Sequence, residues 1–137
     1  MSTQQDLNVL RTPLQKCSTR AEDPVSGWFR DGFCRSDPKD YGKHTVAGIL
    51  TPAFLEFSKS RGNDLSTPRP GFPGLTGGCR WCLCVERWKE AFTARTEYGD
   101  KIVPLVDLTA THADALNHVP LSDFKMFSSE HRPPPQR

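Results

Sequence analysis

The sequence predicts an α+β fold: a single domain with a small sheet, a few short helices and long ordered loops. The chain has 137 residues, a length that favours one domain with one core. Hydrophobic residues make up 36%, and 12 prolines with 10 glycines indicate that ordered loops and turns form much of the fold. Short strand-like runs and helical patterns alternate only loosely along the chain, which favours α+β.

The globular domain is expected over residues 7–128. Residues 1–6 and residues 129–137, the latter with three consecutive prolines, hold too little apolar surface to offset the entropy of ordering them. We therefore expect a flexible N-terminus and a flexible Pro-rich tail. Between residues 7 and 43 the pattern is irregular, and the Asp31-Gly32 pair favours turns and one short hairpin.

The first regular elements are expected after this irregular region. Residues 45–50 are apolar and partly β-branched, which favours a short buried strand. Thr51 followed by Pro52 predicts a helix start, because the hydroxyl can cap a free amide and the fixed φ of proline suits the first helical position. Gly62 marks the end of that helix, since glycine readily adopts the left-handed conformation found there.

A long loop and a second helix are expected next. Residues 63–78 contain several prolines and glycines and form too long a segment for a simple connection. Beyond this loop, apolar residues recur at helical spacing from near Leu83 to Arg95, with charged residues on the opposite face. This pattern predicts an amphipathic helix packed on the core.

The remaining elements are shorter. Residues 102–108 predict a second strand, and Pro104 within it argues for an edge position or a bulge because proline lacks a backbone N–H. Thr111 is placed to cap a short helix, and Pro120 begins another one.

The charge balance argues against two classes of partner. Lys and Arg number 18 against 16 Asp and Glu, which is too balanced for a nucleic-acid or membrane surface, so we expect neither partner. The N-terminus lacks the pattern of a secretion signal or a transit peptide, and no apolar run can span a bilayer, so a soluble cytoplasmic protein is expected. Its five cysteines should then be reduced thiols or metal ligands rather than bridges.

A cysteine-rich segment suggests a metal site. Cys79, Cys82 and Cys84 combine two spacings that can each place a pair of sulfurs on one metal ion, so zinc is one hypothesis. The other thiols, Cys17 and Cys34, lie far away in sequence and could join only through folding. The alternative is that the cysteines pack as small buried hydrophobes.

A nucleophilic thiol is a second hypothesis for the same segment. Cys82 or Cys84 at the start of the following helix would have its thiolate stabilised by the helix dipole. A catalytic cysteine also needs a base within hydrogen-bond reach, and His44 or His112 can supply it only through tertiary folding.

A group of carboxylates precedes His44. Asp31, Asp37 and Asp40 lie close enough to the histidine in sequence to suggest an oxygen-ligand metal site or an acid/base pair. The alternative is that these carboxylates are solvated turn residues.

The loop after Gly62 carries a dense set of polar groups. The residues proposed to bind a small polar ligand, together with one tryptophan beyond the loop, are Asn63, Asp64, Ser66, Thr67, Arg69 and Trp81. An arginine in such a loop can form paired hydrogen bonds with a carboxylate or phosphate. The alternative is that the loop side chains satisfy neighbouring amides within turns.

Several of these motifs are similar to those of a known family. They include Gly27-Trp28-Phe29-Arg30-Asp31-Gly32, Phe54-Leu55-Glu56-Phe57-Ser58 and Trp81-Cys82-Leu83-Cys84. From residue 7 to residue 127 the chain resembles the bacterial-type uncharacterised family catalogued as domain of unknown function 2237. The resemblance implies no activity. It does imply a candidate cluster of Cys17, Cys34, Cys82 and Cys84, and it makes the Cys79-to-Cys82 spacing incidental, because an acidic residue is expected at position 79.

These observations favour a pocket where residues 62–68 meet residues 81–84, with His44 and Asp64 as polar lining. The function they favour is binding of a metal ion or a small polar ligand by this Cys/His-lined pocket. One alternative is a thiol-dependent enzyme that uses Cys82 or Cys84. Another is a non-catalytic structural or interaction protein with buried reduced cysteines.

Overall fold

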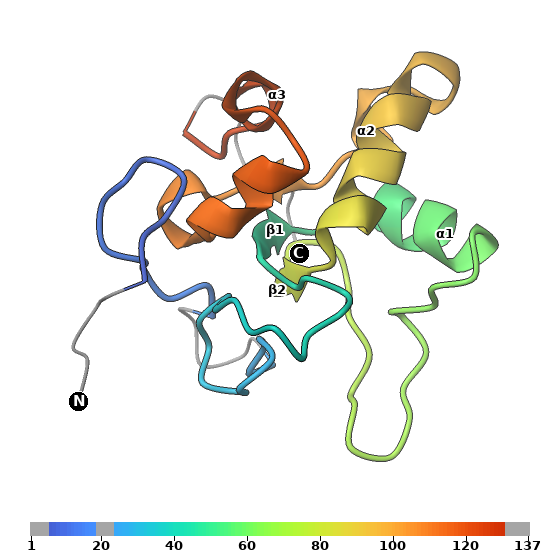
Figure 1. The fold of residues 1–137 in the computed structure, drawn as a ribbon. Helices are drawn as coiled ribbons and strands as arrows, with labels where there is room; N and C mark the ends of the chain where they lie inside the picture. The colour runs from blue at the N-terminus through green and yellow to red at the C-terminus, as the bar shows by residue number, and fades with distance from the viewer. Residues whose placement is uncertain (1–5, 19–23, 131–137) are drawn as a thin grey trace.

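The computed structural model describes residues 6–18 and 24–130, and the predicted flexible ends fall mostly outside these ranges. A three-stranded antiparallel sheet in the order β2-β1-β3 lies at its centre (Figure 1). Its strands are β1 Val46–Ile49, β2 Arg80–Leu83 and β3 Leu105–Val106. The α-helices are α1 Pro52–Ser60, α2 Val85–Tyr98 and α3 Leu121–Met126, and the 3₁₀ turns are η1 Asp100–Ile102, η2 Leu108–Ala110 and η3 Ala113–Asn117. The predicted α+β fold is confirmed.

Helix α1 begins and ends as its sequence predicts. The Thr51 hydroxyl accepts a hydrogen bond from the Phe54 amide at 2.9 Å, and Pro52 occupies the first helical position. Just after the helix, Gly62 has a φ of +91°, in the left-handed region that favours glycine. The strand predicted before the helix is also present, as β1.

Residues 80–98 form a strand followed by a helix, and the predicted helix start is corrected. Sequence spacing placed a helix start near Leu83, whereas Arg80–Leu83 forms strand β2 and the helix begins at Val85. Three of the four strand residues are buried, so the strand lacks the alternation of apolar and polar residues that identifies a half-exposed strand. Cys84 occupies the N-cap position of α2, which agrees with a cysteine at the helix start.

Three further local predictions need correction. The strand predicted over residues 102–108 shortens to Leu105–Val106 because 3₁₀ turns flank it, although it is an edge strand as Pro104 suggested. The side chain of His112, and not that of Thr111, caps the turn that follows by accepting from the Asp114 amide. Residues 24–45 form turns and bends without the hairpin expected at Asp31-Gly32.

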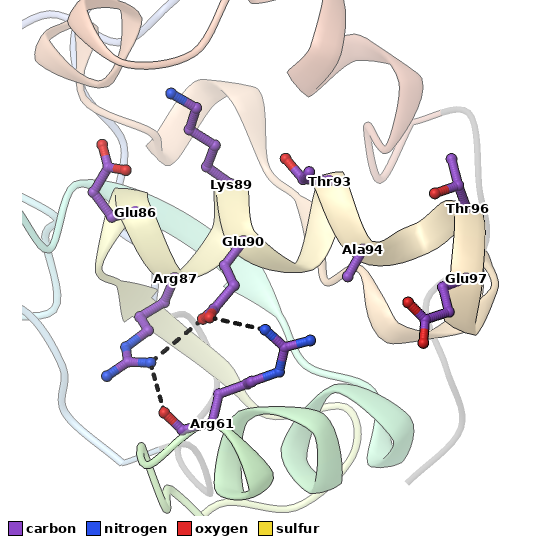
Figure 2. Close-up of a pocket in the computed structure, with 9 residues that line it drawn as sticks. All are labelled: Arg61, Glu86, Arg87, Lys89, Glu90, Thr93, Ala94, Thr96 and Glu97. Carbon is purple, nitrogen blue, oxygen red and sulfur yellow. Dashed lines mark hydrogen bonds and ion pairs between the residues drawn. The ribbon is translucent and has the colours of Figure 1, made fainter.

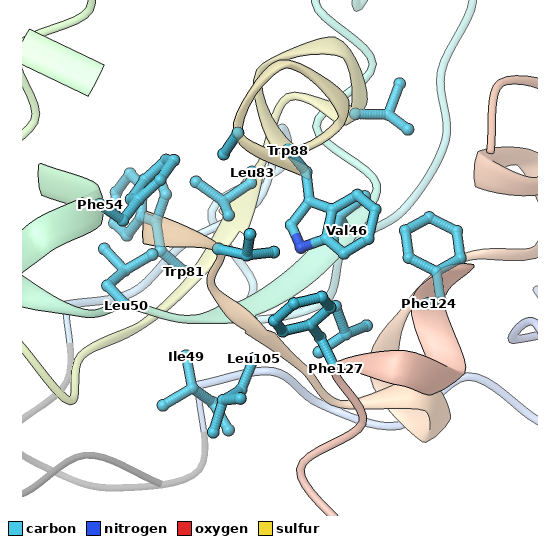
Figure 3. Packing of buried hydrophobic residues seen from close by; sticks show 14 of the residues in the cluster. Val46, Ile49, Leu50, Phe54, Trp81, Leu83, Trp88, Leu105, Phe124 and Phe127 are labelled. Atoms are coloured by element: carbon cyan, nitrogen blue, oxygen red, sulfur yellow. The ribbon is translucent and has the colours of Figure 1, made fainter. Parts of the chain in front are cut away.

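The main core surrounds Trp88 of α2, which is fully buried. Its indole N–H donates to the Pro104 carbonyl at 3.0 Å, so the polar atom of the ring is satisfied. The ring stacks on Phe92 at a centroid distance of 5.1 Å. It also contacts Phe124 and Phe127, at centroid distances of 4.8 and 6.4 Å (Figure 3). This cluster fastens α2 and α3 to the sheet.

A second, smaller cluster lies against the sheet and contains three of the cysteines. Its buried residues are Cys17, Cys34, Ala47, Cys82 and Ala110. The cross-strand pair of Val46 and Leu83 belongs to the main core, whereas the next pair, Ala47 and Cys82, belongs to the cysteine cluster. Successive residues of a strand point to opposite faces, so β1 and β2 contribute to both clusters.

Candidate functional site

Folding brings three distant cysteines together. Cys34 and Cys82 form a disulfide with a Cα–Cα distance of 5.3 Å, across a sequence separation of 48 residues. The Cys17 sulfur lies within 4.8 Å of both bridged sulfurs, and all three side chains are buried. The arrangement places a thiol close to a disulfide, and these are the two groups that react in thiol–disulfide exchange.

The disulfide corrects the prediction that all five cysteines are reduced. Cys34 and Cys82 are bridged, while Cys17, Cys79 and Cys84 are thiols. The prediction followed from the expected compartment, and spacing alone cannot show that residues on a turn and on β2 lie at bridging distance. Cys84 lies outside the three-sulfur cluster among the described residues. Cys79 accepts from the Thr76 amide at 3.5 Å and is not bonded to Cys82, so the C-x-x-C spacing is incidental.

A pocket of about 380 Å³ opens beside the disulfide. It is lined by Gly27, Trp28, Arg30, His44, Leu65, Arg69, Phe72, Trp81 and Cys82. This volume lies within the range of small-molecule sites. The pocket joins four parts of the sequence: the turn that begins at Gly27, the segment around His44, the long loop and β2.

The turn at Gly27 allows the backbone to approach the disulfide closely. Gly27 has a φ of +96°, and a Cβ built on it would lie 2.2 Å from the Phe33 carbonyl oxygen and 3.8 Å from the Cys82 sulfur. A larger residue would therefore clash here. The Ser26 hydroxyl donates to the Cys82 sulfur at 3.4 Å, so the same turn supplies a polar contact to the bridge.

His44 is oriented by a buried carboxylate. Its Nδ1 lies 2.7 Å from Asp40 Oδ1, and its backbone N–H donates to Asp40 Oδ2 at 2.9 Å. Asp40 is 1% exposed, whereas the His44 side chain is 41% exposed. A carboxylate oxygen that accepts a hydrogen bond from Nδ1 favours the tautomer with a proton on Nδ1. Asp40 and His44, which lie close together in sequence, are thus joined by two hydrogen bonds.

The guanidinium groups of Arg30 and Arg69 lie over aromatic rings. The Arg30 carbon Cζ is 5.5 Å from the Trp81 ring centroid, and that of Arg69 is 4.8 Å from the Phe72 centroid. The two rings pack edge to face at 5.6 Å. Within residues 6–18 and 24–130, neither arginine forms an ion pair with a carboxylate. The pocket therefore holds two cations stacked on its aromatic wall.

The residues predicted to bind a ligand fall into two groups: some line the pocket, and the others form hydrogen bonds with one another within the loop. Arg69 and Trp81 line the pocket, whereas Asn63, Asp64, Ser66 and Thr67 are not among its lining residues. The Asp64 carboxylate accepts hydrogen bonds from the amides and hydroxyls of Ser66 and Thr67, at 2.6–3.1 Å. These bonds, led by that from the Thr67 hydroxyl, hold the pKa of Asp64 well below its usual range. The geometry favours the alternative in which the loop satisfies its own polar groups.

His112 is placed away from the pocket lining. Its Nδ1 caps η3, and its Nε2 lies 3.2 Å from Asp6 Oδ1. Both ring nitrogens therefore have structural partners in the region where the N-terminal segment meets the η3 turn.

A larger cavity, of about 710 Å³, lies between α1 and α2, but its charges neutralise one another. Figure 2 shows Glu90 between Arg61 and Arg87, which it meets at 3.4 and 3.3 Å. Arg87 also donates to the Arg61 carbonyl at 3.1 Å. The groove contains no thiol or imidazole among its lining residues, so the smaller pocket is the candidate site.

Comparison with known proteins places the chain in a family. The model of a family described as an uncharacterised protein conserved in bacteria, DUF2237, matches residues 7–128. The chain belongs to the DUF2237 family. A search of curated proteins found no match. The span of the family match contains the disulfide, Cys17 and every residue that lines the pocket in this DUF2237 protein. None of the helices described for it is long and apolar enough to cross a membrane.

Among the pocket residues of this DUF2237 protein that were not identified from sequence are Arg30 and Phe72, which contribute a cation and an aromatic ring. Arg30 and Phe72 belong to segments that were noted for their turns, and not for a contribution to a pocket. Arg30 adopts a φ of +55°, which few residues other than glycine adopt, within the turn from Gly27 to Gly32. A glycine-bounded turn that carries an arginine is the signal that could have found it.

Proposed function

We propose that this DUF2237 protein carries a redox-active thiol–disulfide centre, which acts on a small molecule held in the adjoining pocket. The observation that supports the proposal is that Cys82 is both half of a disulfide and part of a pocket wall. A disulfide that served only to stabilise the fold would not need to lie in the wall of a pocket that also contains a histidine and two arginines.

The reaction needs only a thiol as co-substrate. The thiolate of a bound molecule attacks the Cys82 sulfur, and the bond between Cys82 and Cys34 breaks as a mixed disulfide forms. Cys34 leaves as a thiolate and takes up a proton. A second thiol then attacks the mixed disulfide, so that the small molecule leaves as a disulfide and the protein holds two thiols. Reversal of these steps oxidises the protein.

His44 and Cys17 have roles that follow from their positions. With Nδ1–H directed to Asp40, His44 Nε2 can accept the proton of an incoming thiol within the pocket. The Cys17 thiol, within 4.8 Å of both bridged sulfurs, can attack Cys34 and release Cys82 as a thiol into the pocket. This adds Cys17 and Cys34 to Cys82 as residues of a thiol-dependent activity, the enzyme alternative that the sequence suggested.

The predicted cytoplasmic location agrees with a functional bridge. In a reducing compartment, disulfides are usually transient and serve catalysis or redox sensing. A bridge between Cys34 and Cys82 in the cytoplasm would therefore open and close during activity and would not persist as a fixed brace.

Redox titration tests the proposed function. The full-length protein is equilibrated in buffers of reduced and oxidised glutathione or dithiothreitol, its thiols are alkylated, and the number of labels is counted by mass. We expect a transition of two labels, from the disulfide of Cys34 and Cys82, with a midpoint between about −180 and −270 mV, the range of redox-active dithiols.

The Cys84→Ser variant is the matched control, because Cys84 is a thiol outside the sulfur cluster and serine suits the N-cap position it occupies. It should keep the transition, whereas the double variant Cys17→Ser with Cys82→Ser, which leaves Cys34 without a neighbouring thiol of this cluster, should lose it. A midpoint below about −300 mV would identify a structural bridge and overturn the proposal.

A second candidate function, metal binding, is favoured by the packing of three sulfurs within 4.8 Å. After reduction, Cys17, Cys34 and Cys82 would supply three thiolates, the ligand type that zinc favours, and the candidate Cys84 is not part of the group. We expect the reduced protein, under anaerobic conditions, to bind one Co²⁺ per chain with a sulfur-to-cobalt charge-transfer absorption. Cys17→Ser should abolish that absorption and Cys84→Ser should preserve it. Absence of the absorption in the reduced wild-type protein would exclude this function.

A further inference from the structure

We propose that the pocket selects small thiols and disulfides that carry a negative charge, of the class represented by thiol carboxylates. This inference rests on the proposed redox function of the same site and specifies its substrate. It follows from three features of the pocket: its charge, its aromatic wall and the position of the disulfide.

Among the described residues, the side chains that line the pocket carry positive charge and no negative charge. None of the lining residues that the structure describes is acidic, while Arg30 and Arg69 are both cationic. The hydrogen bonds of these two arginines go to backbone oxygens, of Gly27 at 3.5 Å and of Asp64 at 3.1 Å. Four other arginines of the described residues, Arg35, Arg61, Arg80 and Arg87, do form ion pairs with carboxylates. An anionic ligand would supply the carboxylate partner that Arg30 and Arg69 do not find among the described residues.

The aromatic wall holds the cations in place and accepts the apolar part of a ligand. Trp81 and Phe72 support the two guanidinium groups from beneath, and each arginine loses little conformational freedom when it binds because stacking already restricts it. Trp28, which is 44% exposed, adds a further apolar surface at the pocket. A short carbon chain between a charged group and a sulfur suits these walls.

The disulfide supplies the reactive end. Cys82 lines the same pocket as both arginines, so a ligand whose carboxylate meets a guanidinium group can direct its sulfur to the Cys82 sulfur. The step is the exchange described above: the ligand thiolate forms a bond to Cys82, the bond from Cys82 to Cys34 breaks, and Cys34 leaves as a thiolate that takes up a proton. Positive charge also favours the thiolate over the thiol of the incoming molecule.

The test compares three thiols of similar size and different charge: 3-mercaptopropionate, which is anionic, 2-mercaptoethanol, which is neutral, and cysteamine, which is cationic. Rate constants for reduction of the bridge between Cys34 and Cys82 are measured by alkylation and mass and expressed per thiolate. Each is then divided by the rate constant of the same thiolate with a small neutral disulfide, which removes the difference in intrinsic nucleophilicity between the thiols. We expect 3-mercaptopropionate to react at least about tenfold faster than cysteamine, with 2-mercaptoethanol between them, because two nearby cations attract or repel the reagent. The advantage should shrink as salt is added.

Variants assign the selectivity to the arginines. The double variant Arg30→Gln with Arg69→Gln should bring the ratio of the anionic to the cationic rate constant close to one. Arg87→Gln, which removes an arginine of the groove between α1 and α2, should keep the wild-type ratio.

The outcomes separate this inference from the function on which it rests. If all three thiols open the bridge at equal rates relative to their rates with the small neutral disulfide, the substrate class is wrong and the redox function stands. If none of them opens it under native conditions, the redox function itself fails. A selectivity that persists in the double variant would show that other residues carry it and would also contradict the proposal.

Discussion

Replacing Trp88 with alanine is expected to lower the free energy of unfolding by about 3–5 kcal/mol, as large-to-small changes of buried aromatic residues do. Trp88 is fully buried, contacts three phenylalanine rings and satisfies its own N–H on Pro104. The change would leave a cavity between α2 and α3 and would leave the Pro104 carbonyl without this donor. Urea-induced unfolding followed by circular dichroism measures the loss.

Trp28 provides the matched control for this substitution. It is the same residue type, but it is 44% exposed, so Trp28→Ala removes little buried surface. We expect it to cost less than about 1 kcal/mol. Equal destabilisation by the two variants would contradict the view that the aromatic cluster around Trp88 is the main core.

Opening the disulfide is expected to lower the free energy of unfolding by about 2–4 kcal/mol. The bridge joins residues 48 positions apart, and closing a loop of that length restricts the unfolded chain considerably. Urea unfolding of the wild-type protein, with and without a reductant strong enough to open the bridge, gives the difference.

The double variant Cys34→Ser with Cys82→Ser is the control for this measurement. It lacks the bridge, so the reductant should leave its stability unchanged. If the reductant destabilised the double variant as much as the wild type, the effect would come from another part of the protein. If it changed neither protein, the bridge would contribute nothing to stability.

Local features of the fold could be predicted because nearby residues decide them. Thr51, Pro52 and Gly62 lie at the ends of one helix, and each acts on amides or carbonyls within a few residues of itself. Strand β2 was missed for the opposite reason. Its residues pair with β1, which lies far away in sequence, and three of the four are buried. The sequence of Arg80–Leu83 therefore shows no alternation of apolar and polar residues that would predict a strand.

The site could be predicted only in part for the same physical reason. Asp40 and His44 are four residues apart, so their pairing could be suspected from sequence. The bridge between Cys34 and Cys82 and the contact with Cys17 depend on how a turn folds against the sheet, which spacing does not encode. The two arginines of the pocket differ in the same way. Arg69 could be suspected because it lies in the polar loop, whereas Arg30 is identified only by its position over the Trp81 ring in the folded protein.

The disulfide also fixes the shape of the cavity beside it. It ties the turn region of residues 24–45, which contains no strand, to β2, and so links the wall that carries Trp28 and Arg30 to the wall that carries Trp81. A molecule that fits the tied cavity better than the untied one must, by thermodynamic reciprocity, make the bridge harder to reduce. Ligand binding in the cavity therefore changes the reduction potential of the disulfide, and reduction of the disulfide changes the affinity for the ligand by the corresponding factor.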